Sequence, residues 1–126
     1  MSSERNKQVK TLLTVLKRHD LKNEAHAKIL CGDFNDLPSS PTVRRILNSE
    51  EKFSDALASC HPRTAGFTYS PRNPYVDRSW TVDERIDYIF VNRHPFSKKC
   101  AIVFDEHDGF DFVSDHFGVF CSLDFR

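Results

Sequence analysis

The 126-residue chain is long enough for one folded domain and too short for two. Its 18 Lys and Arg residues balance its 18 Asp and Glu residues, so it lacks the positive field of a dedicated duplex-binding domain. The four cysteines form no C-x-x-C pair, and no apolar run could cross a bilayer, which argues against a zinc ribbon and a membrane span. We therefore expect one soluble domain, residues 1–126, with reduced cysteines, located in the cytoplasm or alternatively the nucleus.

The first half of the chain carries mostly helix signals. Residues 4–18 place apolar side chains at helical spacing and predict an amphipathic helix. A continuous apolar run over residues 27–31 predicts a strand that is covered on both faces. Ser40 and Pro41 are typical of an N-cap followed by the first residue of a helix, and Asn48 can end that helix.

The second half carries mostly strand signals, separated by loops. Residues 53–57 predict one short apolar turn. Residues 60–80 are rich in proline and aromatic residues and predict a long irregular loop, which at this length is more often functional or disordered than a plain connection. The predicted strands are residues 85–91, 100–104 and 117–123, with an acidic loop over residues 105–111.

The first chemical signal follows the strand over residues 27–31. Asp33 and Asn35 stand two residues apart, and side chains two apart along a strand share one face. One supplies a carboxylate, and the other supplies an amide that can donate and accept. The competing interpretation is an Asx turn, in which both side chains bond to local backbone.

The second signal joins two later stretches. Asp87 shares a strand face with Ile89 and Val91, where a carboxylate without a partner would be costly. His116 directly precedes the last predicted strand. If these strands are neighbours, Asp87 can accept a hydrogen bond from one ring nitrogen of His116, which fixes the tautomer and leaves the other nitrogen for proton transfer. The competing interpretation of Asp115-His116 is a surface turn.

Three short stretches occur in order: Gly32-Asp33-Phe34-Asn35, Arg85-Ile86-Asp87-Tyr88 and Ser114-Asp115-His116. In these stretches the sequence resembles the endonuclease/exonuclease/phosphatase superfamily, the DNase I-like metal-dependent phosphoesterases. The resemblance implies an α/β fold, the DNase I-like four-layer α/β sandwich, of which this chain is the C-terminal half. For that half we expect one mixed sheet with flanking helices.

The resemblance also implies a role for each matching residue in a hydrolase of phosphoric esters. Asp33 would orient or deprotonate the attacking water, and Asn35 would bond a phosphate oxygen. His116 would stabilise the pentacovalent phosphate or protonate the leaving oxygen, and Asp87 would hold His116 in place. In-line displacement at phosphorus needs an aligned nucleophile and groups that stabilise the negative charge that develops on the phosphate oxygens.

Ligand sites follow from the same resemblance. A divalent ion, Mg²⁺ or Mn²⁺, would be held by Asp33, Asn35 and Asp115. Substrate would be bound by Asn35 and by Asn73, which lies in the irregular loop. Residues 68–76 are similar to a loop of neutral sphingomyelinase-like and uncharacterised members, while nuclease branches also belong to the superfamily. The substrate is therefore either a phospholipid or sphingolipid, or a nucleic acid.

One departure from the family concerns length. Family members are much longer, and their first half contributes an asparagine and a glutamate metal ligand that nothing before Lys28 can supply. We therefore expect half a sandwich that exposes an apolar sheet face, associates in solution and is inactive alone, with the missing half supplied by a longer chain. The alternative function is a non-catalytic half-domain that acts only as a binding or pairing module.

Overall fold

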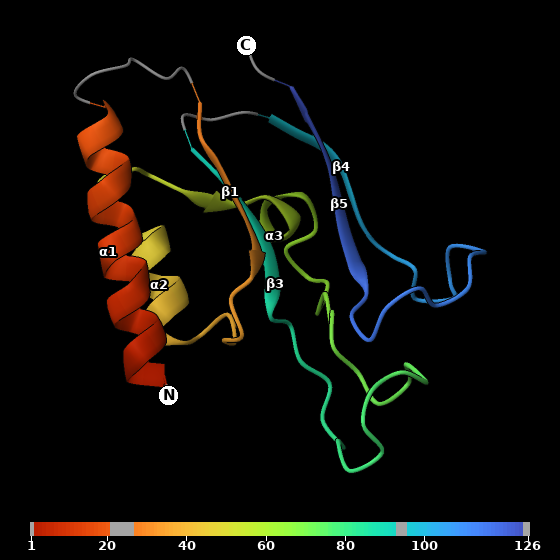
Figure 1. Ribbon diagram of the computed structural model, residues 1–126. Helices are drawn as coiled ribbons and strands as arrows, with labels where there is room; N and C mark the ends of the chain where they lie inside the picture. Colours follow the sequence, from red (N-terminus) through yellow and green to blue (C-terminus); the bar gives the residue numbers. More distant parts are fainter. Residues whose placement is uncertain (1, 21–26, 93–95, 125–126) are drawn as a thin grey trace.

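The computed structural model describes residues 2–20, 27–92 and 96–124 (Figure 1). Two helices, α1 and α2, lie on one side of a sheet, and a hairpin of two long strands lies on the other side of the molecule. The elements in chain order are α1 (Ser2–Asp20), β1 (Ile29–Asp33), α2 (Pro41–Leu47), β2 (Ser54–Asp55), α3 (Ala56–Cys60), β3 (Asp87–Val91), β4 (Phe96–Val103) and β5 (Gly118–Asp124). No helix in the described ranges is both long and apolar enough to span a membrane.

The two predicted helices are confirmed, and local sequence explains where they lie. In α1 the buried Val9 belongs to the apolar stripe, and Leu13 and Leu16 pack beside it against the sheet. The hydroxyl of Ser40 accepts a hydrogen bond from the Val43 amide at 3.2 Å, which caps the first turn of α2. The helices thus cover one face of the sheet with a core that includes Ile46 and Phe90, both fully buried.

The first sheet has three strands in the order β1-β3-β2, all antiparallel. Its register is set between β1 and β3, where Cys31 faces Ile89 and Asp33 faces Asp87. Residues directly opposite on neighbouring strands point to the same face of a sheet. The last residue of β1 and the first residue of β3 therefore bring two carboxylates to one edge.

The second sheet is the antiparallel hairpin of β4 and β5, in which Cys100 faces Cys121. It packs on the first sheet through α3, around a core of Leu57, Val91 and Cys100. The mixed α/β fold class is confirmed, but the expected single mixed sheet is replaced by two antiparallel sheets in the part of the chain that the structure describes. The described parts of the two sheets are not joined by backbone hydrogen bonds between β3 and β5. The amide of Phe117, just before β5, instead donates a hydrogen bond to the carbonyl of Thr68 in the preceding loop.

The apolar turn predicted over residues 53–57 is instead a two-residue strand, β2, followed by α3. Asp55 accounts for the helix, since its side chain accepts a hydrogen bond from the Ala58 amide at 3.2 Å. The same carboxylate oxygen accepts a 2.6 Å hydrogen bond from the buried guanidinium of Arg85. A capping interaction and an ion pair therefore share one side chain.

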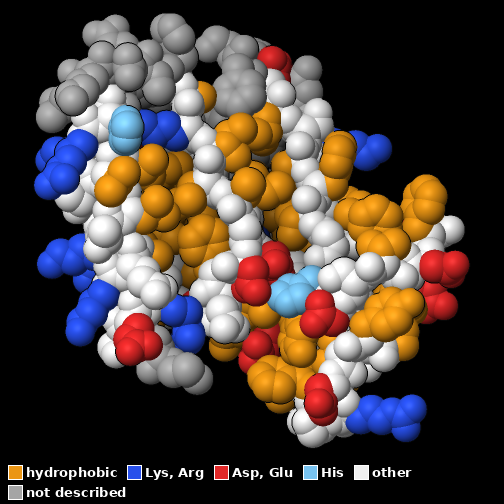
Figure 2. Space-filling view, viewed as in Figure 1, with side chains coloured by type: hydrophobic (Ala, Val, Ile, Leu, Met, Phe, Trp, Pro, Cys, Tyr) orange, Lys and Arg blue, Asp and Glu red, His pale blue; other side chains and the backbone are white. Residues whose placement is uncertain are grey.

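The prediction that residues 27–31 are covered on both faces is wrong. Leu30 packs under the helices, but the side chains on the opposite face, Ile29 and Cys31, are exposed. Hydrophobic side chains accordingly gather over the strands on the face shown in Figure 2. The reason is that α1 and α2 shield only one face of β1, and no described element covers its other face near Cys31.

Candidate active site

Asp33 and Asn35 mark a sharp change of backbone direction where β1 ends. Gly32 has φ of +145° and Asn35 has φ of 51°, a left-handed conformation that asparagine tolerates better than most residues. One carboxylate oxygen of Asp33 accepts a 2.8 Å hydrogen bond from the Asn35 amide. The Asx-turn interpretation is therefore right for this oxygen. The assumption that both side chains lie on one strand face is wrong, because Asn35 is no longer in extended conformation.

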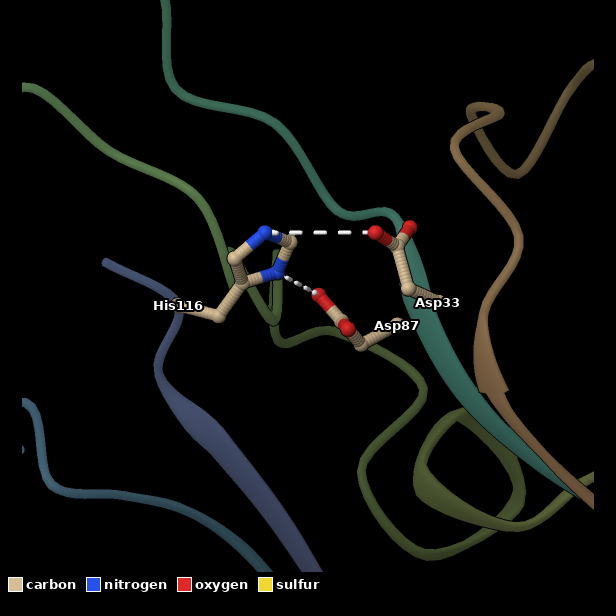
Figure 3. A group of neighbouring side chains, drawn as sticks. All are labelled: Asp33, Asp87 and His116. Atoms are coloured by element: carbon tan, nitrogen blue, oxygen red, sulfur yellow. Dashed lines mark hydrogen bonds and ion pairs between the residues drawn. The ribbon is translucent and has the colours of Figure 1, made fainter. Parts of the chain in front are cut away.

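The second carboxylate oxygen of Asp33 faces the imidazole of His116, as Figure 3 shows. The distance from His116 Nε2 to Asp33 Oδ2 is 3.9 Å, which is too long for a direct hydrogen bond. The other ring nitrogen, Nδ1, lies 2.8 Å from Asp87 Oδ2. The partner that the sequence predicted for Asp87 is thus His116, and three strand ends converge on one imidazole.

The surroundings of the ring change its acidity. Burial of His116 lowers its pKa, but the hydrogen bond to Asp87 and the charges of Asp87, Asp33 and Asp115 outweigh burial and raise the pKa above its ordinary value. The Asp87 carboxylate fits Nδ1–H as its donor, so Nε2 is the nitrogen that faces Asp33. The His116 side chain is 25% exposed, so the ring is partly accessible from solvent.

We expect Asp87→Asn to lower the pKa of His116, because the charge that raises it is removed while burial remains. Proton NMR titration of the ring in EDTA-containing buffer measures this pKa. Asp115→Asn is the matched control, since Asp115 is the weakest of the named influences and should give a smaller decrease. An unchanged pKa in Asp87→Asn would contradict the assigned hydrogen bond.

The same interaction makes stability depend on pH. Because the pKa of His116 is raised in the folded protein, its contribution to the free energy of unfolding is fully present below pH about 6.5, the ordinary pKa of histidine. The contribution is lost as the pH rises through the pKa of His116 in the folded protein. Urea unfolding at a series of pH values should show this decrease in the wild type and a smaller one in Asp87→Asn, where only Asp33 and Asp115 still favour the charged ring.

The predicted ligands of a divalent ion are only partly brought together. Oxygens of Asp33 and Asp87 and a ring nitrogen of His116 all lie within 4.8 Å of one another. Asp115 is exposed and accepts a 3.2 Å hydrogen bond from the Ser114 hydroxyl, and it is not part of this group. Mg²⁺ is usually held by one or two carboxylates with water and substrate phosphate. The exposed oxygens of Asp33 and Asp115 fit that chemistry, whereas Asp87 is occupied by the imidazole.

Asn73, a predicted substrate-binding residue, lies in the interior and is only 1% exposed. Its Nδ2 donates a 2.7 Å hydrogen bond to the Ser114 carbonyl, and its Oδ1 accepts one of 3.0 Å from the Tyr75 amide. Both ends of the amide are therefore engaged inside the protein. These contacts favour a role in positioning the residues around Ser114 over contact with substrate.

The sequence analysis gave no role to two loop residues near the site, Thr68 and Tyr69. The ring of Tyr69 packs against the ring of His116 with centroids 5.0 Å apart, and the neighbouring Thr68 is fully buried. The alternation of Phe67, Thr68 and Tyr69 resembles a short extended segment, and Tyr69 does form an isolated bridge with Glu84. That alternation was the only available indication that the loop is ordered against the strands.

Comparison with known proteins adds independent findings. Residues 3–116 match the model of the Endonuclease/Exonuclease/phosphatase family. An endonuclease/exonuclease/phosphatase family protein from Leptotrichia buccalis superposes with a TM-score of 0.68 at 26% identity over 93% of this chain and 42% of that one. No curated protein sequence matches the chain significantly.

Two further solved structures show the same fold. The human Nocturnin catalytic domain with bound sulfate anion matches 99% of this chain and 42% of its own length, with a TM-score of 0.73 and 20% identity. TDP2 from D. rerio, complexed with a single-strand DNA product, matches 98% of this chain and 51% of its own length, also with a TM-score of 0.73 and 20% identity. The chain therefore spans about half the length of the solved structures it resembles.

Proposed function

Because the chain belongs to the endonuclease/exonuclease/phosphatase family, we propose that it carries the catalytic edge of a divalent-metal-dependent phosphodiesterase in which water attacks phosphorus. The observation that supports this proposal most strongly is the meeting of Asp33, Asp87 and His116 at one edge of the sheet. On the face shown in Figure 2, acidic side chains gather around an exposed histidine ring. Such a group of side chains can position an attacking water and transfer a proton as a general acid or base.

The spacing of the two outer groups suggests where the reacting atoms lie. His116 Nε2 and Asp33 Oδ2 are 3.9 Å apart, so an oxygen placed between them can lie within hydrogen-bond distance of both. Asp33 accepts a proton from an attacking water in this arrangement. Nε2–H of His116 donates to an oxygen of the phosphoryl group, where negative charge develops.

Asp87 acts through His116 in the proposed reaction. Its carboxylate is less exposed than that of Asp33, at 20% against 47%, and it holds Nδ1 at 2.8 Å. It therefore fixes the direction in which Nε2 points and stabilises the charged ring. Asn35 is exposed in the turn after β1, and its side-chain amide would bond a second phosphate oxygen.

The metal ion belongs to the proposal as well. Asp33 and Asp115 are both exposed carboxylates whose charges act on the His116 ring, and with the side-chain carbonyl of Asn35 they would hold Mg²⁺ or Mn²⁺. When bound, the ion would offset negative charge on the phosphate oxygens. The protein's own part is to orient water through Asp33 and to hold the proton on His116.

The proposed substrate is a phosphodiester. Nucleic acids and phospholipids both contain this group, and an assay can distinguish between them. A relative solved with a single-strand DNA product supports a nucleic acid. The balanced charge and the loop over residues 68–76 support a phospholipid instead. Short single-stranded DNA and sphingomyelin in detergent micelles are the two substrates to compare.

EDTA is expected to abolish hydrolysis of bis(4-nitrophenyl) phosphate, because it removes the ion proposed to offset negative charge on the phosphate oxygens. Release of 4-nitrophenol is followed with Mg²⁺, with Mn²⁺ and after chelation, and restored activity on adding excess Mg²⁺ is the control. The assay uses this chain alone and a longer polypeptide that contains it. Turnover that persists in EDTA would contradict the proposal.

A non-catalytic half-domain is the second candidate, and one observation favours it. Ile29 and Cys31 expose an apolar face of β1, on which a second chain would pack. Light scattering and the phosphodiesterase assay on the purified chain distinguish the two. Association without turnover, in both this chain and the longer polypeptide, would support the half-domain function.

A further inference from the structure

The loop between α3 and β3 contains a buried segment that contacts both strand ends of the candidate active site. Thr68, Ser70 and Asn73 are each at most 1% exposed, although they lie in a region without helix or regular strand. Buried polar side chains need hydrogen-bond partners, and those of this segment are the backbone and side chains around the site. The following inference rests on the proposed function, because it concerns the geometry of that same site.

Thr68 bonds to the strand that carries Asp87. Its hydroxyl oxygen accepts hydrogen bonds from the amides of Ile86 and Asp87, at 3.1 and 3.2 Å. Its own amide donates to the Glu84 carbonyl at 2.9 Å. The backbone at Asp87 is thus held by a side chain from outside the sheet at the point where β3 begins.

Thr68 also bonds to the strand that follows His116. Its carbonyl oxygen accepts a 2.7 Å hydrogen bond from the amide of Phe117, the residue next to His116. A second tether comes from Asn73, whose amide group donates to the Ser114 carbonyl at 2.7 Å. The segment therefore holds the backbone on both sides of His116.

These contacts matter because β3 and β5 belong to different sheets. No ladder between them is present in the described residues to set the separation of the Asp87 carboxylate and the His116 ring. We propose that Thr68 is a positioning residue that sets this separation, with its hydroxyl on the Asp87 side and its carbonyl on the His116 side. Asn73 supports the same geometry from the Ser114 side.

The test compares Thr68→Val, which keeps the shape of the side chain and removes the hydroxyl, with Thr68→Ser, which keeps the hydroxyl. The readout is the downfield proton NMR signal of His116 Nδ1–H, which is visible when a hydrogen bond protects it from exchange with water. We expect Thr68→Val to lose this signal and Thr68→Ser to retain it. Thr64→Val, at an exposed position of the same loop, is the matched control and should leave the signal unchanged.

Two outcomes would overturn the proposal. One is a folded Thr68→Val variant that retains the protected Nδ1–H signal, and the other is a Thr68→Ser variant that loses it to the same extent. Should Thr68→Val fail to fold, hydrogen exchange of the wild type decides the question. The amides of Asp87 and Phe117 should then exchange slowly and to a similar degree, and rapid exchange of either one would reject the role of Thr68.

The NMR readout does not require turnover, so it separates this proposal from the proposed function. Loss of the Nδ1–H signal in a chain that hydrolyses no phosphodiester would support the positioning role and reject the activity. In an active polypeptide, Thr68→Val should lower kcat by about tenfold or more with little change in KM, because it disturbs alignment and not ground-state binding. Thr68→Ser should restore most of that loss.

Discussion

The His116→Ala variant is expected to lower kcat for phosphodiester hydrolysis by about a thousandfold, the scale for removal of a group that stabilises transition-state charge. The reason is that Nε2 is the one ring nitrogen not bonded to Asp87 and faces the Asp33 carboxylate. Steady-state hydrolysis of bis(4-nitrophenyl) phosphate with saturating Mg²⁺ measures the effect, in an active polypeptide that contains residues 1–126. KM should change much less than kcat.

The control for this variant is His107→Ala. His107 is an exposed histidine whose Nδ1 lies 3.1 Å from the Asp105 carbonyl oxygen and 3.6 Å from its carboxylate, in the loop between β4 and β5. Its removal should leave kcat within about twofold of the wild type, because surface substitutions away from a site usually have small effects. A His116→Ala enzyme that retains most of its rate would remove His116 from the reaction.

Asp33→Ala is expected to lower kcat by a similar factor, about a thousandfold, since it removes the group proposed to orient and deprotonate water. The difficulty is that Asp33 has two roles, because one of its oxygens also accepts the Asn35 amide in the turn. Asp33→Asn separates them. It keeps an oxygen for the turn and loses the basic carboxylate, so it should retain the fold and lose the rate.

Asp77→Ala provides a second comparison for the turn itself. Asp77 makes the same local contact, accepting a 2.8 Å hydrogen bond from the Ser79 amide, and it is exposed in a loop. Its loss should leave kcat nearly unchanged. If Asp33→Asn kept full activity, the role of Asp33 would be confined to closing the turn after β1.

The sequence was sufficient to predict elements whose signals are local. The stripe in α1 and the cap of α2 depend on residues within a few positions of one another, and both lie where they were expected. The pairing of Asp87 with His116 was also accessible, because a carboxylate among aliphatic side chains needs a partner and His116 precedes a strand. The helix predictions needed no knowledge of which strands meet, whereas the pairing of Asp87 with His116 was predicted on the condition that their strands are neighbours.

Features that depend on long-range packing could not be predicted. The apolar run that ends at Cys31 has the composition of a doubly covered strand, but composition does not reveal that the described helices shield only one face. Asn73 and Thr68 resemble solvated loop residues until the loop folds back against both strand ends. The argument that put Asn35 on the same strand face as Asp33 failed because alternation holds only while the backbone stays extended.

The central claim is that Asp33 and His116 act on a single phosphoryl group, and the double variant Asp33→Ala/His116→Ala tests it most directly. Residues that act as a unit have strongly non-additive effects on kcat. We therefore predict that the double variant is about as slow as the slower single variant. If the losses instead multiplied, to about a millionfold, the two side chains would act independently and the account would be contradicted.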